Sequence, residues 1–223
     1  MIEVGPGPGG LTRALLDTGA RVTAIEKDPR CVDALRELES AYPKQLTVVE
    51  ADALETDLTA LVPAPRRIVA NLPYNVATPL LIGWLRQLHA DRTAFARLTL
   101  MFQKEVAERL LAPPGTKARG RLSVMTQWLC EIAREFDISP KAFVPPPKVT
   151  STVVTLTPRA APLGDAAVAW TAMERVVAAG FGQRRKMLRQ SLKGIGLDPA
   201  SRGIDGTRRA ETLTVEEFAT LAR

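Results

Sequence analysis

Cysteine is scarce in this chain of 223 residues, which contains only Cys31 and Cys130. They lie far apart and without C-x-x-C spacing, so they predict neither a disulfide framework nor a zinc site, and we expect both to be small buried side chains. Long apolar runs are also lacking, since none approaches the roughly 20 residues of a membrane span. The first residues are strand-like, unlike a basic and apolar leader. We therefore expect a cytoplasmic protein without membrane contact.

The chain is long enough for one substantial core and too short for two large domains, and 46% of its residues are hydrophobic. We expect one α/β domain with a small addition. The 30 basic residues exceed the 24 acidic residues, which leaves a formal net charge of +6. Such an excess suits a polyanionic partner, but a basic protein that binds no polyanion would also show it.

Short apolar runs alternate with longer helical patterns in the first part of the chain, as in a parallel sheet with crossover helices. Two later runs complete the set, so strands are expected at residues 1–4, 21–26, 46–50, 67–71, 95–102, 131–138 and 151–156. Helices are expected at residues 11–18, 29–40, 76–89 and 104–111. The apolar stripe of the third helix, from Val76 to Leu88, predicts packing against the core.

The pattern becomes wholly helical beyond Pro158. Before that point, residues 140–147 connect the last two strands and are stiffened by three consecutive prolines. We place a domain boundary between Pro158 and Asp165. The sequence thus predicts a first domain over residues 1–160 and a small helical domain over residues 161–223.

A glycine-rich turn follows the first strand and precedes the first helix. Gly5, Gly7 and Gly10 fit G-x-G-x-x-G, and Glu26 ends the second strand, where it could accept both hydroxyls of a ribose. A nicotinamide dinucleotide and an adenosyl cofactor fit equally, and so does a turn that only needs small residues. Glu3 favours the adenosyl cofactor, because an acid suits the cationic methionine end of S-adenosylmethionine better than a pyrophosphate.

The third strand ends just before Asp52 and Ala53. Asp52 should therefore lie at the same carboxyl edge of the sheet as Gly5 and Glu26, where open α/β sheets bind their ligands. An acid at this position could accept the amino group of an adenine. The alternative is that Asp52 caps the N-terminus of a helix.

The most specific motif, N-L-P-Y-N, ends the fourth strand and matches the [N/D]-[P/I/L]-P-[Y/F/W] pattern of amino-methyltransferases. An amine on an aromatic ring is a poor nucleophile, because its lone pair is delocalised. The Asn71 side chain and the Leu72 carbonyl can accept its protons and direct the lone pair, while Pro73 sets the turn and Tyr74 offers a stacking face. This chemistry needs no general base, so we expect the single histidine, His89, to be structural. An ordinary strand-ending turn is the alternative.

Together, E-V-G-P-G-P-G-G-L-T, V-T-A-I-E-K-D, N-L-P-Y-N and F-V-P-P-P-K-V-T-S resemble the KsgA-type small-subunit ribosomal RNA adenine dimethyltransferases, from Ile2 to about Leu192. The resemblance implies a Rossmann-like class I methyltransferase sheet, S-adenosylmethionine as cofactor, and a monomer that dimethylates two adjacent adenines near the 3′ end of that RNA. The resemblance implies that the cofactor is bound by Glu3, Gly5, Gly7, Glu26, Asp52, Ala53 and Asn71. The catalytic residues it implies are Asn71, Leu72, Pro73, Tyr74 and Phe143.

Phe143 in the proline-rich loop would be the second stacking aromatic, and its alternative is a loop anchor in the core. RNA contact is expected from the cations Arg184, Arg185, Lys186, Arg189 and Lys193, with no acid between Glu174 and Asp198. On a helix, Arg185, Arg189 and Lys193 would share one face, which could bind phosphate or simply be solvated. Lys117, Arg119 and Arg121 form a looser basic loop that could flank the RNA or carry exposed charges.

Members of the resembled family carry a segment similar to K-x-x-G-Q-N-F-L before the glycine-rich strand, where it covers the cofactor. Residues 1–223 begin at the strand, so we expect them to bind S-adenosylmethionine weakly. A misassigned start, a fragment and a truncated protein stay open as explanations.

Three other functions stay open. One is a non-catalytic RNA-binding assembly factor of the same fold. Another is a nicotinamide-dependent oxidoreductase, which leaves N-L-P-Y-N unexplained. The third is a large-subunit RNA methylase of the macrolide-resistance type, which shares N-[L/I]-P-Y, although the segment F-G-Q-R-R-K favours the small subunit.

Overall fold

The computed structural model describes residues 1–223, except for the side chains of Tyr74 and Asn75. The chain forms two compact units. Unit 1 consists of Met1–Lys104 and Arg134–Thr157, and unit 2 consists of Glu105–Ala133 and Pro158–Arg223. This division differs from the one expected at residue 160, because residues 105–133 group with the C-terminal helices.

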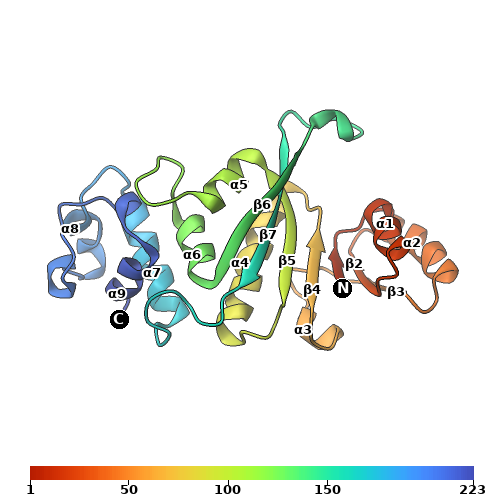
Figure 1. Ribbon diagram of the computed structural model, residues 1–223, viewed down its shortest axis with the longest axis horizontal. Helices are drawn as coiled ribbons and strands as arrows, with labels where there is room; N and C mark the ends of the chain where they lie inside the picture. Colours follow the sequence, from red (N-terminus) through yellow and green to blue (C-terminus); the bar gives the residue numbers. More distant parts are fainter. The chain divides into compact units, whose positions relative to one another are not determined.

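The strands form a seven-stranded sheet in the order β3-β2-β1-β4-β5-β7-β6 (Figure 1). Neighbouring strands from β3 to β5 are parallel, and β7 runs antiparallel to β5. The strands are β1 (Ile2–Val4), β2 (Val22–Glu26), β3 (Leu46–Glu50), β4 (Arg67–Ala70), β5 (Arg97–Gln103), β6 (Cys130–Ile138) and β7 (Ser151–Pro158). The predicted class, a mostly parallel Rossmann-like α/β sheet of seven strands, is confirmed.

The strand order reverses between β1 and β4, which lie side by side although two strands separate them in the sequence. At such a switch point, the connections leave the two strands on opposite sides of the sheet. A crevice therefore opens beyond their carboxyl ends, and open α/β sheets bind ligands there.

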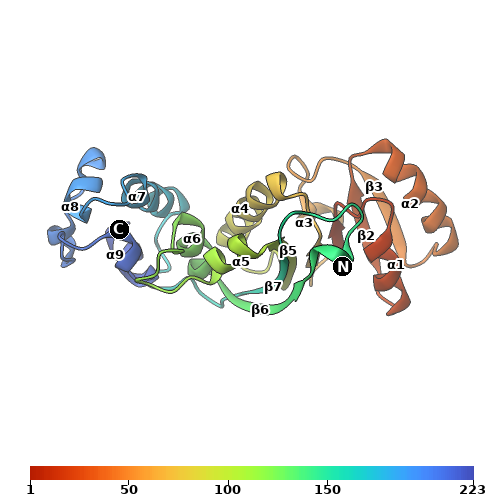
Figure 2. The same cartoon turned by 90° about the horizontal axis from the view of Figure 1, so that it is seen from above.

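The helices predicted between the strands are present, together with a short α3 (Leu58–Leu61) that was not predicted. α2 begins where Asp28 accepts a hydrogen bond from the backbone nitrogen of Arg30 at 3.0 Å, with Pro29 as its first residue. α4 lies alongside β5 (Figure 2) and buries Leu81 and Trp84 of the predicted stripe. The predicted helices are α1 (Gly10–Asp17), α2 (Pro29–Ala41), α4 (Tyr74–Ala90) and α5 (Lys104–Leu111).

Unit 2 is built around α6 (Arg121–Leu129), which was not predicted as a helix. It packs against α7 (Trp170–Gly182) and α9 (Val215–Leu221), and the rings of Trp128 and Trp170 lie 6.2 Å apart. Six of its nine residues are buried, so α6 lacks the one-sided apolar stripe by which a surface helix is found in a sequence. This central position explains why residues 105–133 belong to unit 2. Unit 2 also contains the short α8 (Leu188–Ser191) and short 3-10 helices at Lys193–Ile195, Pro199–Arg202 and Ala210–Thr212.

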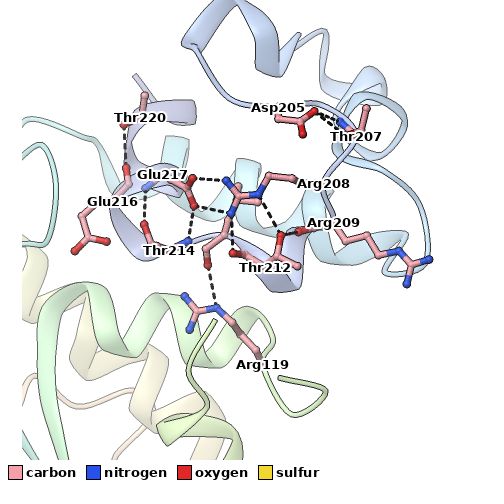
Figure 3. A network of polar contacts seen from close by, with 11 residues as sticks. Arg119, Asp205, Thr207, Arg208, Arg209, Thr212, Thr214, Glu216, Glu217 and Thr220 are labelled. Atoms are coloured by element: carbon pink, nitrogen blue, oxygen red, sulfur yellow. Dashed lines mark hydrogen bonds and ion pairs between the residues drawn. The ribbon is translucent and has the colours of Figure 1, made fainter. Parts of the chain in front are cut away.

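Arg119 holds a loop of unit 2 in place from inside the fold. It is fully buried, and its guanidinium donates to the carbonyls of Ala112 at 2.9 Å and Leu213 at 3.2 Å, and to Gln127 Oε1 at 3.0 Å. Figure 3 shows it directed at the segment that leads into α9. Both interpretations of Arg119, as a contact near the RNA and as an exposed loop charge, are therefore wrong.

Further polar contacts hold the segment that leads into α9, which Arg119 contacts through the Leu213 carbonyl (Figure 3). Thr214 and Glu217 form a reciprocal capping box at the start of α9, with hydrogen bonds of 2.8 and 3.2 Å. Arg208 forms an ion pair with Glu217 and donates to the carbonyl of Thr212 at 2.8 Å. The C-terminal helices are thus ordered by side chains as well as by their apolar core.

Among the described residues, no helix is long and apolar enough to cross a membrane, and no group of three or more His, Cys, Asp or Glu residues could hold a metal ion. Both cysteines are free thiols, in agreement with the sequence. Cys130 is buried as expected, whereas Cys31 is partly exposed. Cys31 differs from the expectation because it lies near the start of α2, where the helix surface is only half covered.

Candidate functional site

The glycine-rich turn after β1 adopts a backbone that favours glycine. Gly5, Gly7 and Gly9 have φ angles of +66°, +57° and +90°. A Cβ on Gly5 would also come within 3.2 Å of the Leu72 side chain. The nitrogen of Gly5 donates to the carbonyl of Ile25 at 2.9 Å, which ties the turn to the end of β2. These constraints shape the backbone at the switch point.

Glu26 is the centre of a hydrogen-bond cluster at the end of β2. Its Oε2 accepts the backbone N–H of Gly7 at 3.0 Å, and its Oε1 accepts those of Lys27 at 2.8 Å and Asp28 at 2.9 Å. The side chain therefore links the glycine turn to the start of α2. Glu26 is largely buried, with 9% of its surface exposed.

Asp52 follows β3 at the same edge of the sheet. Its Oδ1 accepts the backbone N–H of Leu54 at 2.9 Å, and Lys27 Nζ lies 3.4 Å from its Oδ2. These two contacts, the first the stronger, lower the pKa of Asp52. The residues after Asp52 form a turn and the next helix begins at Leu58, so the helix-cap alternative is wrong.

These groups surround a cavity of about 440 Å³, called the first cavity. It brings together six of the seven residues predicted to bind the cofactor: Gly5, Gly7, Glu26, Asp52, Ala53 and Asn71. Sequence reasoning missed Lys27, Leu54, Val76 and Leu80, which also line it. Val76 and Leu80 belong to the apolar stripe of α4, whose periodicity alone does not separate core positions from cavity positions.

Glu3, the seventh predicted residue, is 1% exposed and does not line the first cavity. Its Oε2 has no hydrogen-bond partner among the described residues. Burial raises the pKa of Glu3, and the nearby Thr12 hydroxyl offsets this only in part. A buried acid with an unsatisfied oxygen is costly for folding, and such groups are concentrated at functional sites.

Replacing Glu3 with Gln is expected to stabilise the protein at neutral pH. Because the folded-state pKa is raised, the stability that protonated Glu3 contributes is complete below pH 4.5 and is lost as the pH rises through the folded-state value. We expect Glu3→Gln to raise the free energy of unfolding by roughly 1 kcal/mol at neutral pH, the lower end of the cost of an unpaired buried polar group.

Urea unfolding at pH 7 and pH 4 measures this effect, with exposed Glu37→Gln on α2 as the matched control. The stabilisation by Glu3→Gln should shrink at the lower pH, and the control should change little at either. An equal effect of Glu3→Gln at both pH values would show that ionisation of Glu3 does not oppose folding.

A second cavity, of about 290 Å³, adjoins the first. It is lined by Asn71, Leu72, Pro73, Met101, Phe143, Val144, Pro145 and Pro147. Phe143 is half-buried and lines this cavity, so it is not the core anchor that was the alternative. The predicted stacking residue Tyr74 has its side chain outside the described residues.

Asn71, Leu72 and Pro73 line both cavities and so form their common wall. On one side of this wall are the carboxylates of Glu26 and Asp52, and on the other are an aromatic ring and apolar side chains. Two ligands bound in these cavities would meet at Asn71. The first cavity suits a polar ligand with a positive charge, and the second cavity suits a flat, apolar one. A nicotinamide-dependent oxidoreductase would leave both the second cavity and Asn71 without a use.

A family model described as "Ribosomal RNA adenine dimethylase" matches residues 1–223. The chain belongs to this family of dimethylases. Ribosomal RNA small subunit methyltransferase A of Rhodospirillum rubrum is 61% identical to the dimethylase over 227 residues, which cover 100% of this chain and 77% of the relative. The resemblance inferred from the motifs is confirmed.

Two solved structures show that the dimethylase shares the fold of RNA methyltransferases. A dimethyladenosine transferase from Plasmodium falciparum has a TM-score of 0.78 at 25% identity, over 99% of this chain and 87% of that one. The 23S rRNA methyltransferase ErmE has a TM-score of 0.71 at 29% identity, over 99% of this chain and 88% of that one.

The cations predicted to contact RNA lie in unit 2 of the dimethylase, but not on one helix. α7 ends at Gly182, Arg185 lies in a turn, and a new helix, α8, carries Arg189. The predicted shared helix face is therefore wrong, because the chain leaves the helix after Gly182. Arg185, Lys186, Arg189 and Lys193 are nevertheless exposed.

Arg184 differs from these four cations. Its Nε donates to Glu211 Oε2 at 2.9 Å, and its guanidinium also donates to the carbonyl of Lys117. The backbone nitrogen of Gly115 adds a hydrogen bond to the Glu211 carbonyl at 2.8 Å. Arg184 therefore ties down the loop after α5, which leaves it less available for a phosphate than its neighbours.

Proposed function

We propose that this dimethylase transfers methyl groups from S-adenosylmethionine to the amines of two adjacent adenines near the 3′ end of small-subunit ribosomal RNA, as a step in small-subunit assembly. The observation that carries the proposal is the common wall of the two cavities, formed by Asn71, Leu72 and Pro73. The 61% identity to a small-subunit methyltransferase, against 29% to a 23S rRNA methyltransferase, supports the small-subunit target. We further propose that it acts as a monomer in the cytoplasm.

The first cavity fits S-adenosylmethionine in volume and in charge. Pockets for such ligands range over about 300 to 1,000 Å³. A carboxylate has about four acceptor positions, and Glu26 uses one at Oε2 and two at Oε1, which leaves room at Oε2 for a ribose hydroxyl. Asp52 would accept the adenine amino group, and Glu3, whose Oε2 has no partner among the described residues, would attract the cationic methionine end.

The second cavity would hold the target adenine, flipped out of the RNA. Phe143 offers it a stacking face, as Tyr74 would on the basis of the motif. The Asn71 side-chain oxygen and the Leu72 carbonyl would accept the N–H groups of the amine and align its lone pair with the first cavity. S-adenosylmethionine, when bound, supplies an electrophilic methyl group. Leu72 and Met101 are the buried apolar part of this cavity and would shield that side of the acceptor from water.

Methyl transfer to under-methylated small ribosomal subunits tests the proposed function. The subunits are incubated with the protein and methyl-labelled S-adenosylmethionine, and the RNA is then digested to nucleosides. We expect label in dimethyladenosine, and none when fully methylated subunits replace the substrate. Absence of label from adenine in the under-methylated subunits would contradict the proposal.

We propose that Arg185, Lys186, Arg189 and Lys193 bind RNA phosphates. The triple variant Arg185→Ala, Lys186→Ala, Lys193→Ala should weaken RNA binding about tenfold and reduce the slope of log affinity against log salt by about 2 to 3. Filter binding at several salt concentrations measures both quantities.

The matched control removes three exposed cations of unit 1, Arg13, Arg21 and Lys44. It changes the net charge equally, so only a local phosphate contact separates the two variants. Equal losses of affinity would show that net charge, and not this part of unit 2, attracts the RNA.

A further inference from the structure

Met101 lies in the neighbouring strand β5, two residues before its carboxyl end and level with Asn71. In the parallel pairing of β4 with β5, Ala70 is level with Leu100, so Met101 is level with Asn71, the first residue after β4. Paired strands are about 4.8 Å apart. Met101 is 8% exposed and lines the second cavity together with Asn71. It is therefore a wall of the cavity close to where the amine of the acceptor would lie.

Dimethylation makes an unusual demand on that wall, because the same cavity must bind two acceptors in turn. The first is an amine with two N–H groups, which Asn71 and Leu72 could both hold. The second has one N–H group and one methyl group. Because this methyl group cannot donate a hydrogen bond, it must pack against an apolar surface. The lone pair of the amine must still point toward the first cavity.

The other described apolar walls of the second cavity cannot yield easily. Leu72 is buried, and its side chain packs against Gly5, where a Cβ would come within 3.2 Å of it. Pro73, Pro145 and Pro147 are closed rings, and Phe143 is a rigid aromatic plane. Val144 is fully exposed and offers no enclosed surface. Met101 has an unbranched side chain with three rotatable bonds and a polarizable sulfur, which adapts to the shape of its neighbour.

We propose that Met101 determines product specificity by making room for the first methyl group during the second transfer. The inference rests on the proposed function, since it presumes adenine in the second cavity. In this proposal, Met101 contacts the acceptor adenine and does not contact the cofactor. A stiff side chain at this position should slow the second methylation selectively.

The test compares Met101→Ile with Met101→Leu, using RNA substrates that carry adenine or N6-methyladenine at the target. Isoleucine is branched at Cβ and has little rotamer freedom in a strand, whereas leucine keeps an unbranched Cβ at similar volume. Single-turnover rates of each transfer are measured by mass spectrometry of the nucleosides. The binding of S-adenosylmethionine is measured in parallel by calorimetry.

We expect Met101→Ile to slow the second transfer about tenfold relative to the first, the lower end of what one methyl group contributes in an apolar pocket. Monomethyladenosine should accumulate and cofactor affinity should stay unchanged, and Met101→Leu, which keeps an unbranched Cβ, should accumulate less monomethyladenosine than Met101→Ile. Met101→Ala, which opens the wall, should not accumulate monomethyladenosine, and it serves as the second variant if isoleucine disturbs folding.

Equal slowing of both transfers by Met101→Ile, or accumulation of monomethyladenosine by Met101→Ala, would overturn this inference alone. A wild-type protein that leaves adenine unmethylated would overturn the proposed function, and the inference with it. The two failures are therefore distinguishable from the same set of reactions.

Discussion

Asn71→Ala is expected to lower the rate of methyl transfer roughly 10²- to 10³-fold, the loss that follows removal of one preorganised hydrogen-bonding group from an active site. Asn71 belongs to the wall between the two cavities, so its side-chain oxygen is placed to accept an N–H of the amine. Without it, the lone pair stays conjugated with the adenine ring. Single-turnover transfer to under-methylated small subunits measures the rate.

Asn71→Asp is the matched control, because it keeps an acceptor oxygen at the same place and the motif itself allows Asp. We expect it to retain far more activity than Asn71→Ala. Binding of Asn71→Ala to small subunits should be unchanged, since the proposed phosphate contacts lie in unit 2. Transfer by Asn71→Ala at the wild-type rate would contradict the role of Asn71, and loss of RNA binding would show a structural defect.

Glu26→Ala is expected to weaken S-adenosylmethionine binding about 100-fold, which corresponds to about 2.7 kcal/mol. The variant loses the proposed ribose acceptor. It also releases the backbone N–H groups of Gly7, Lys27 and Asp28, which the carboxylate holds at 2.8 to 3.0 Å. The glycine turn would then lose its fixed geometry. Calorimetry with S-adenosylmethionine and with its demethylated product measures the affinity.

Glu50 provides the control for Glu26. The two residues are level with each other at the ends of β3 and β2, but Glu50 is exposed and does not line the first cavity. Glu50→Ala therefore removes the same charge from the same edge of the sheet and should leave affinity unchanged. Equal losses in the two variants would show that Glu26 acts only through its charge.

The α/β sheet was predictable because each of its elements carries a local pattern. Strands buried on both faces are continuous apolar runs, and the crossover helices carry apolar stripes. The proposed cofactor residues were predictable for a related reason. Gly5, Glu26, Asp52 and Asn71 each lie at the carboxyl end of a parallel strand or within two residues after it, and parallel strands end at one edge of a sheet.

Other features were beyond the reach of local patterns. α6 is buried on most sides and so has no stripe to detect. Arg119 is a charged residue in a basic loop, and its burial depends on the carbonyls of Leu213 and Ala112. Arg185, Arg189 and Lys193 recur every four residues, a spacing that fits one helix. The chain nevertheless leaves the helix between the end of α7 and the start of α8. Met101 lies beside Asn71 only through the register of β4 and β5.

The sequence by itself determined the fold class, the family and the residue types for binding a cofactor and activating an amine. These follow from residues that are close in the chain or repeat with a fixed period. Only the tertiary structure decided that one wall separates two cavities, that Met101 lines the second of them, and that Arg119 is inside while Arg185 is exposed. The physical reason is that burial and strand register depend on groups distant in the chain, which no local pattern contains.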